Sequence, residues 1–201
     1  MVPRTSGRLV VIVGPDGVGK TTLANHLLES WPGAKGYFHF RPPIFRRMDV
    51  SPPSTDAPPP PKARGEGPVV AGWLRLFYNL ALFWTGYLLK VRPVLGRDGL
   101  VVADRWAYGY LVQPESLRFY GPTWLATSVL KMFPRPHVVV VAHAPLETVY
   151  SRKSELTPDE IARELRAWDA IPFRRSVRID TSADPETAAH ELRRYLQKDA
   201  M

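Results

Sequence analysis

Short runs of apolar residues, several of them rich in valine, recur along the chain with helical patterns between them. Continuous apolar runs are typical of strands that are buried on both faces of a parallel sheet, whereas half-exposed strands alternate. The runs predict five strands, at residues 9–13, 36–40, 99–103, 137–142 and 177–180. The sequence therefore indicates a sheet that helices cover on both sides.

The stretches between these runs carry helix signals. Pro32-Gly33 ends the first helix, and Thr157-Pro158 followed by two acidic residues predicts a capped start for a later one. The predicted helices span residues 19–31, 69–96, 122–133, 145–153, 157–170 and 184–198. Because strands alternate with helices, we expect an α/β fold, a three-layer α/β/α sandwich around a five-stranded parallel sheet.

Residues 41–68 differ from the rest of the chain, because prolines crowd this short polar stretch and exclude regular helix. We interpret the segment as a Pro-rich loop inserted into one domain that spans residues 1–201, and not as a boundary between two domains. The pattern is compatible with a loop that has no function and with a lid over a substrate.

The strongest chemical signal follows the first predicted strand. Gly14-Pro15-Asp16-Gly17-Val18-Gly19-Lys20-Thr21 matches the P-loop pattern, with a strand before it and a helix after it. Glycines let several backbone N–H groups point at one anion, and the helix N-terminus adds positive charge. In such a loop the lysine reaches the β- and γ-phosphates of ATP and the threonine hydroxyl binds Mg²⁺. We therefore expect a P-loop NTPase fold that binds ATP through Gly14, Asp16, Gly17, Val18, Gly19, Lys20, Thr21 and Thr22.

A second signal is Asp104-Arg105, which directly follows the strand at 99–103. Open α/β sheets bind their ligands at the carboxyl ends of strands. Asp104 is a candidate to hold a Mg²⁺-bound water or to orient an acceptor, and Arg105 can clamp a phosphate with its planar fork. Alone the dipeptide indicates a salt bridge, but beside a P-loop a catalytic interpretation is favoured.

Weaker candidates lie elsewhere. Arg152-Lys153 falls at a joint between two predicted helices, in a candidate lid at about residues 150–160. It is compatible with closure over a transferring phosphoryl group and with a solvated polar turn. Asp16, inside the loop, and Arg41, after the second strand, are candidates to face the phosphate acceptor. His39 has no metal-ligand partner at a suitable spacing, and we interpret it as structural.

Composition and charge narrow the range of partners. The 201 residues include no cysteine, which excludes disulfides, zinc fingers and thiol catalysis and fits a cytoplasmic protein. The net charge of +8 is compatible with a phosphate-bearing partner and with a solvated basic face. Because the basic residues are scattered, we expect no nucleic-acid partner.

The apolar segment at residues 73–89 is the one stretch that raises the question of a membrane. Arg75 and Asn79 interrupt it, so its continuous apolar run is shorter than the ~20 residues that a membrane span needs. We interpret it as a core helix and expect no membrane contact.

These residues together resemble the thymidylate kinase family of nucleoside monophosphate kinases, in order and over most of the chain. Asp16 falls on the acidic P-loop residue that contacts the acceptor sugar in that family, and Asp104-Arg105 falls on its Asp-Arg motif, whose arginine binds the acceptor phosphate. Arg152 lies where the family's lid carries basic residues. The resemblance implies Mg²⁺-dependent transfer of the γ-phosphoryl group of ATP to a nucleoside monophosphate, dTMP or a related one. It also implies a homodimer.

The sequence departs from the family pattern on the acceptor side. The family's long helix carries an arginine that helps to bind the thymine nucleotide, but the matching residues 77–84 contain no basic residue. Phe40-Arg41-Pro42 replaces the family's Arg-Glu-Pro. The acceptor therefore stays open between a nucleoside monophosphate, a nucleoside and a sugar phosphate.

Three other classes of function remain as alternatives. The first is a switch protein that binds ATP or GTP without an acceptor, although the sequence lacks the Asn-Lys-x-Asp segment that specifies guanine. The second is a non-catalytic nucleic-acid partner, which the net charge suggests. The third places the apolar helix against a membrane or a lipid-linked acceptor.

Overall fold

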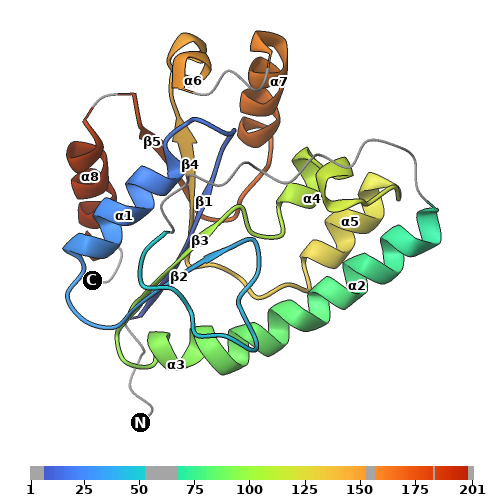
Figure 1. The fold of residues 1–201 in the computed structure, drawn as a ribbon, viewed down its shortest axis with the longest axis horizontal. Helices are drawn as coiled ribbons and strands as arrows, with labels where there is room; N and C mark the ends of the chain where they lie inside the picture. The colour runs from blue at the N-terminus through green and yellow to red at the C-terminus, as the bar shows by residue number, and fades with distance from the viewer. Residues whose placement is uncertain (1–6, 53–67, 153–156, 183, 199–201) are drawn as a thin grey trace.

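The computed structural model describes residues 7–52, 68–152, 157–182 and 184–198 (Figure 1). Its centre is a five-stranded sheet in the order β2-β3-β1-β4-β5, and every pair of neighbouring strands is parallel. The strands are β1 (Arg8–Val13), β2 (Lys35–His39), β3 (Leu100–Asp104), β4 (Val138–His143) and β5 (Ser176–Asp180). The predicted α/β fold and all five predicted strands are confirmed, with ends that differ by about one residue.

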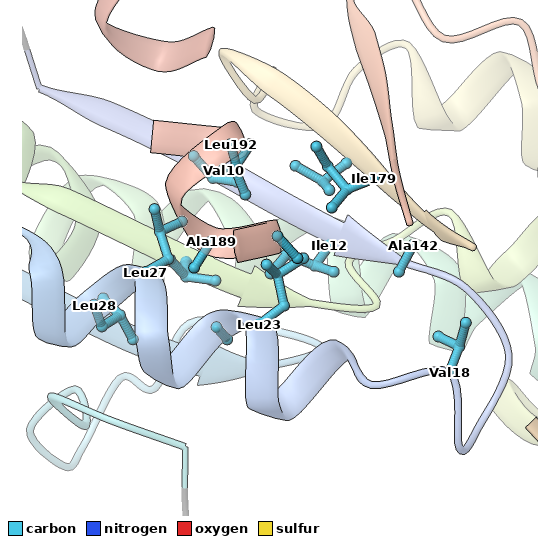
Figure 2. Packing of buried hydrophobic residues seen from close by; sticks show 14 of the residues in the cluster. Val10, Ile12, Val18, Leu23, Leu27, Leu28, Ala142, Ile179, Ala189 and Leu192 are labelled. Carbon is cyan, nitrogen blue, oxygen red and sulfur yellow. The ribbon is translucent and has the colours of Figure 1, made fainter. Parts of the chain in front are cut away.

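Successive residues of β1 point to opposite faces of the sheet and enter two separate cores. Val10 and Ile12 pack against α1 (Lys20–Ser30) and α8 (Pro185–Lys198), as Figure 2 shows. Leu9, Val11 and Val13 belong to the other core. Since both faces are covered, the continuous apolar runs in the sequence follow directly from the two-sided burial of the strands.

The second face is covered mainly by the long helical segment that follows residue 68 (Figure 1). The remaining elements, in chain order, are α2 (Val69–Gly86), a π-helical turn (Tyr87–Val91), α3 (Arg92–Leu95), α4 (Gly109–Val112), a 3₁₀ turn (Glu115–Leu117), α5 (Thr123–Leu130), α6 (Leu146–Arg152) and α7 (Pro158–Asp169). The predicted capped start of α7 is present, and it takes the form of a capping box, in which Thr157 and Glu160 bond each other's backbone N–H groups. The short helix α4 and the 3₁₀ turn were not predicted.

The helix predicted at residues 69–96 is not a regular α-helix along its whole length. It widens into the π-helical turn, where the N–H of Arg92 reaches back to the carbonyl of Tyr87. Pro93 lies just beyond this turn and has no N–H to donate, so the regular hydrogen-bond ladder cannot pass through it. The break thus has a cause that is visible in the sequence.

The interpretation of residues 73–89 as a core helix is correct for one face of α2 only. Leu76, Asn79 and Phe83 are buried, but Leu74, Tyr78 and Leu89 expose 68%, 60% and 59% of their surface. The sequence pattern misled because the helix is apolar on both sides, so burial could not be told from composition. None of the helices in the described residues is long and apolar enough to cross a membrane.

The outer edge of β2 is partly covered by the loop that follows it. The N–H of Tyr37 donates to the carbonyl of Asp49 at 2.6 Å, and the two residues form an isolated antiparallel bridge. The loop that carries Arg41 therefore returns along the edge of the sheet.

An aromatic cluster joins α2 to the ends of β2 and β3. Phe83 packs edge-on against Phe40, Trp106 and Phe133, with ring centroids 5.5, 4.9 and 4.9 Å away. Such pairs add to the stabilisation that burial alone provides. The cluster fixes α2 against the strand ends that carry the candidate site residues.

We expect Phe83→Ala to lower the free energy of unfolding by about 3–5 kcal/mol, because the side chain is fully buried and its removal leaves a cavity. Urea denaturation measures the effect. Tyr78→Ala on the exposed face of the same helix is the matched control and should change stability by no more than about 0.5 kcal/mol. Equal losses in the two variants would contradict the packing described here.

Candidate phosphate-binding site at the ends of β1 and β3

The loop from Gly14 to Gly19 curls between β1 and α1 through three glycines in the positive-φ region. Gly14, Gly17 and Gly19 have φ values of 144°, 84° and 99°, which L side chains rarely adopt. A Cβ atom on Gly14 would also lie 2.9 Å from the carbonyl oxygen of Ala142. The helix that follows begins at Lys20 without a side-chain cap. Its first N–H groups are therefore available to an anion.

Lys20 is almost fully buried, with 6% of its surface exposed. Its Nζ donates to the carbonyl oxygen of Pro15 at 2.8 Å and lies 3.4 Å from Oδ1 of Asp16. A buried ammonium group needs such partners because its desolvation is costly. The loop thus holds Lys20 in place, in contact with the acidic residue that the sequence singled out.

Asp104 is buried at the end of β3, directly beside Ile12 of β1. Its Oδ2 lies 3.6 Å from Nδ1 of His39, while its Oδ1 is buried without a hydrogen-bond partner. Burial acts to raise the pKa of Asp104, but the positive charge of Lys20, the hydrogen bond from His39 and the charge of Arg105 outweigh it and lower the pKa below its usual range. Asp104 is therefore an ionised carboxylate with one oxygen that can accept a ligand.

Arg105 links the P-loop to the helices above the sheet. Its guanidinium forms an ion pair with Oδ1 of Asp16 and donates to Oε1 of Gln113 at 3.3 Å. Gln113 in turn donates to Glu164 of α7 at 2.5 Å. Burial acts to lower the pKa of Arg105, but the carboxylates around it, Asp16 foremost, raise the pKa above its usual value. The guanidinium therefore stays charged.

The backbone of Arg105 and Trp106 is strained. Their φ values of 71° and 45° lie in the left-handed region, at a cost of about 1–3 kcal/mol for each residue. The hydrogen bond from the N–H of Arg105 to the carbonyl of Ile12, at 3.0 Å, holds the turn against β1. Strain of this kind is concentrated at functional sites, and here it turns the chain so that Arg105 meets Asp16.

A second polar chain runs from the end of β2 into α2. Arg41 donates to Oδ1 of Asn79 at 2.8 Å, and Nδ2 of Asn79 donates to the hydroxyl of Tyr110 at 2.6 Å. Asn79 is buried and satisfied by both neighbours, so it holds the exposed Arg41 in a defined position. The buried Asn79 thus orients Arg41 at the same end of the sheet as Asp104.

Arg152 lies on the other side of the P-loop. Its guanidinium donates to the carbonyl oxygens of Thr181 and Ser182 at 3.0 and 3.3 Å, and a Cβ atom on Gly19 would lie 3.5 Å from its Nη1. The structure thus places Arg152 against the loop after β5, next to the last glycine of the P-loop. Lys153 and the next three residues of the candidate lid at 150–160 lie outside the described residues.

Thr21 and Thr22 begin α1, the first half-buried and the second exposed. The Thr21 hydroxyl and the unpartnered Oδ1 of Asp104 are the oxygen donors that Mg²⁺ prefers, and proteins usually bind this ion through one or two carboxylates together with substrate phosphates. Within the described residues no group of three or more His, Asp or Glu side chains could hold a metal on its own. The donor set fits a magnesium ion that a nucleotide brings.

Sequence reasoning missed four residues of the site. Thr181 bonds the P-loop carbonyl of Val18 and the carbonyl of His143 through one hydroxyl. Its position after β5 was a usable signal, because it matches that of Asp104 after β3. His39, interpreted as structural, lies beside Asp104. Gln113 and Glu164 join the site only through the packing of α4 against α7, which leaves no pattern in the sequence.

Comparisons with known proteins support the fold. No protein-family model matches the chain, and no curated protein matches it in sequence. Among solved structures, the chain is similar to the crystal structure of thymidylate kinase from Ehrlichia chaffeensis, with a TM-score of 0.54 and 14% sequence identity. The similarity covers 95% of this chain and 99% of that one. The predicted three-layer α/β/α fold around a five-stranded parallel sheet is therefore confirmed over nearly the whole chain.

We expect Thr181→Val to lower the free energy of unfolding by about 1–3 kcal/mol, because the change keeps the shape of the side chain but takes the hydroxyl donor away from the buried carbonyl of Val18. Urea denaturation measures the loss. Thr127→Val is the matched control, since its hydroxyl donates to a carbonyl on the exposed side of α5. A loss at Thr181 no larger than that at Thr127 would show that the hydroxyl does not support the P-loop.

Proposed function

We propose that this chain is an ATP- and Mg²⁺-dependent phosphotransferase that moves the γ-phosphoryl group of ATP to a nucleoside monophosphate. The observation that carries the proposal is the cluster at the ends of β1 and β3. There a buried carboxylate with a free oxygen, Asp104, lies beside the P-loop, whose Lys20 contacts the Asp16 that holds Arg105. A site with one ligand-ready carboxylate and two fixed cations suits the transfer of an anionic group.

The nucleotide would occupy the P-loop. The glycine-rich turn and the uncapped start of α1 offer N–H groups to the β- and γ-phosphates. Lys20 would exchange its bond to the carbonyl of Pro15 for a phosphate oxygen and stabilise the charge that moves during transfer. Arg152 and Thr181 lie on the side of the P-loop formed by β5. We expect that side to meet the rest of the nucleotide.

The acceptor would approach from the side of Arg41 and Arg105. Its phosphate oxygen forms the new bond to the γ-phosphorus as the bond to the bridging oxygen of ADP breaks. A phosphate is already ionised at neutral pH, so this reaction needs no general base. The neighbouring cations lower the pKa of Asp104, which makes this buried carboxylate a weak base. This arrangement favours a phosphate acceptor over the hydroxyl group of a nucleoside.

Mg²⁺ would be held by Thr21 and Asp104, and when bound it neutralises the charge on the nucleotide's phosphates. The protein's own groups position the reactants around it. Asp16 fixes the guanidinium of Arg105, and the ionised Asp104 keeps Lys20 and His39 oriented through their charges. Most of the rate enhancement would therefore come from positioning and electrostatic stabilisation.

The identity of the acceptor base is the least constrained part of the proposal. The structurally similar protein is a thymidylate kinase, and dTMP is the first acceptor to test. The long helix carries no basic residue at the matching positions, but its Asn79 accepts a hydrogen bond from Arg41 and holds that side chain in place. A nucleotide related to dTMP would therefore be recognised through Arg41 at the end of β2.

We expect Lys20→Ala to lower the turnover of the best acceptor by about 10²–10³-fold, which corresponds to ~2.7–4 kcal/mol of lost transition-state stabilisation. Steady-state kinetics at saturating ATP measure the effect. Lys198→Ala, at the exposed end of α8, is the control and should keep full activity. Turnover of Lys20→Ala close to that of the unaltered protein would remove the P-loop from the mechanism.

The test of the acceptor is ADP formation with Mg²⁺ and a panel of nucleoside monophosphates led by dTMP, then nucleosides and sugar phosphates. We expect turnover with a nucleoside monophosphate. Arg41→Ala should lower kcat/KM for that acceptor by about tenfold or more and leave the KM for ATP unchanged, since a hydrogen bond to a charged group contributes about 1.5–3 kcal/mol.

The control for Arg41→Ala is Arg97→Ala. Arg97 lies in the loop before β3, at the opposite end of the sheet. It should leave kcat/KM unchanged. Turnover with nucleosides alone would contradict the phosphate acceptor, and ATP binding without turnover on any acceptor would favour a switch protein.

A further inference from the structure

The outward face of α2 exposes a row of large apolar side chains along its whole length. They follow the spacing of three and four residues that defines one side of a helix. The row consists of Val70, Leu74, Phe77, Tyr78, Trp84 and Leu88, whose exposed fractions are 65%, 68%, 47%, 60%, 41% and 47%. The opposite side of α2 is buried in the domain. Contiguous exposed apolar surface on this scale marks an interaction site.

The apolar face continues onto α5, which runs beside α2 (Figure 1). The indole of Trp84 donates to the carbonyl of Met132 at 2.8 Å. Met132 and Trp124 are themselves 57% and 66% exposed. The exposed apolar surface therefore extends from the α2 row to Met132, just after α5, and α5 adds the exposed Trp124. We call these exposed residues together the α2–α5 face.

The charges around this face have one sign. None of the 19 acidic residues of the chain falls within residues 69–97 or 116–146, the two segments that build it. The nearest acids in sequence are Asp98, Glu115 and Glu147, each one residue beyond a segment end. The exposed cations of the two segments are Arg75, Arg92, Arg97, Arg118, Lys131 and Arg135. The charged side chains of these two segments are thus all cationic.

We propose that the α2–α5 face binds the surface of an anionic lipid bilayer. Exposed Leu, Phe and Trp side chains would enter the boundary between headgroups and acyl chains, and the Lys and Arg side chains would meet the lipid phosphates. Trp and Tyr are the residues that prefer this interface. Leu74 and Tyr78 are exposed, so this side of the helix is not part of the core. In the proposal, this side lies on the membrane surface and the helix does not cross the membrane.

Charge decides against a second copy of the chain as the occupant. A symmetric pairing through this face would place the cations of both copies in one interface, with no acid within the two segments to offset them. An anionic bilayer supplies the missing negative charge, and each Lys or Arg near such a surface contributes about 1 kcal/mol to binding.

The test is sedimentation of the full chain with vesicles of phosphatidylcholine, with and without phosphatidylglycerol, at low and high salt. We expect binding that rises with phosphatidylglycerol content and falls with salt. Leu74→Ser combined with Tyr78→Ser should lower the partition coefficient by about tenfold or more. Lys131→Gln should lower it by about fivefold, the equivalent of one lysine at an anionic surface.

Two substitutions of the same kind serve as controls. Tyr150→Ser removes an exposed tyrosine from α6, and Lys198→Gln removes an exposed lysine from α8. Both should leave vesicle binding unchanged. The altered residues are exposed, so all variants should unfold at the same urea concentration, which separates a binding defect from misfolding.

Failure to bind phosphatidylglycerol vesicles at low salt would overturn the proposal. So would binding that Leu74→Ser with Tyr78→Ser leaves intact. A dimer in sedimentation equilibrium that the same double substitution dissociates would assign the face to self-association instead. None of these results depends on phosphoryl transfer, so the proposal stands or falls separately from the proposed function.

Discussion

The parallel register between β1 and β3 is the constraint on which the candidate site depends. Ile12 pairs with Asp104 in this register, so the P-loop after β1 and the Asp-Arg pair after β3 leave the sheet at the same edge. A slip of one residue would turn the carboxylate of Asp104 to the other face of the sheet and away from Lys20. The site is thus a product of strand pairing between segments about ninety residues apart in the chain.

Around that edge, charges of opposite sign hold each other in place at low solvent exposure. Lys20 and Arg105 share Asp16 as a partner, and Asp104 lies near the charges of Lys20 and Arg105 and beside the imidazole of His39. Each ion would be expensive to bury alone. The charged groups of the cluster therefore stabilise one another, and one carboxylate oxygen of Asp104 has no hydrogen-bond partner. A site prepared in this way needs little reorganisation when a phosphate anion arrives.

The fold could be predicted well because burial on both faces of a parallel sheet leaves a strong pattern, as in residues 137–142. The P-loop could be predicted because its glycines and Lys20 meet local geometric demands. Gln113 and Glu164 could not, because their bond depends on how α4 meets α7. The exposed face of α2 was also missed, since apolar residues on both sides of a helix look the same in sequence whether they are buried or not.

The bridge between Tyr37 and Asp49 has a consequence for the solubility of the chain. An uncovered sheet edge can recruit strands from other molecules, and folds of this kind must protect it. On the β2 side the loop after Arg41 occupies part of that edge. On the β5 side the strand is short and carries Arg178, paired with Asp169 at 3.1 Å. Trimming the loop after Arg41 to make a smaller protein would expose a template for edge-to-edge aggregation, even if every residue of the phosphate site were kept.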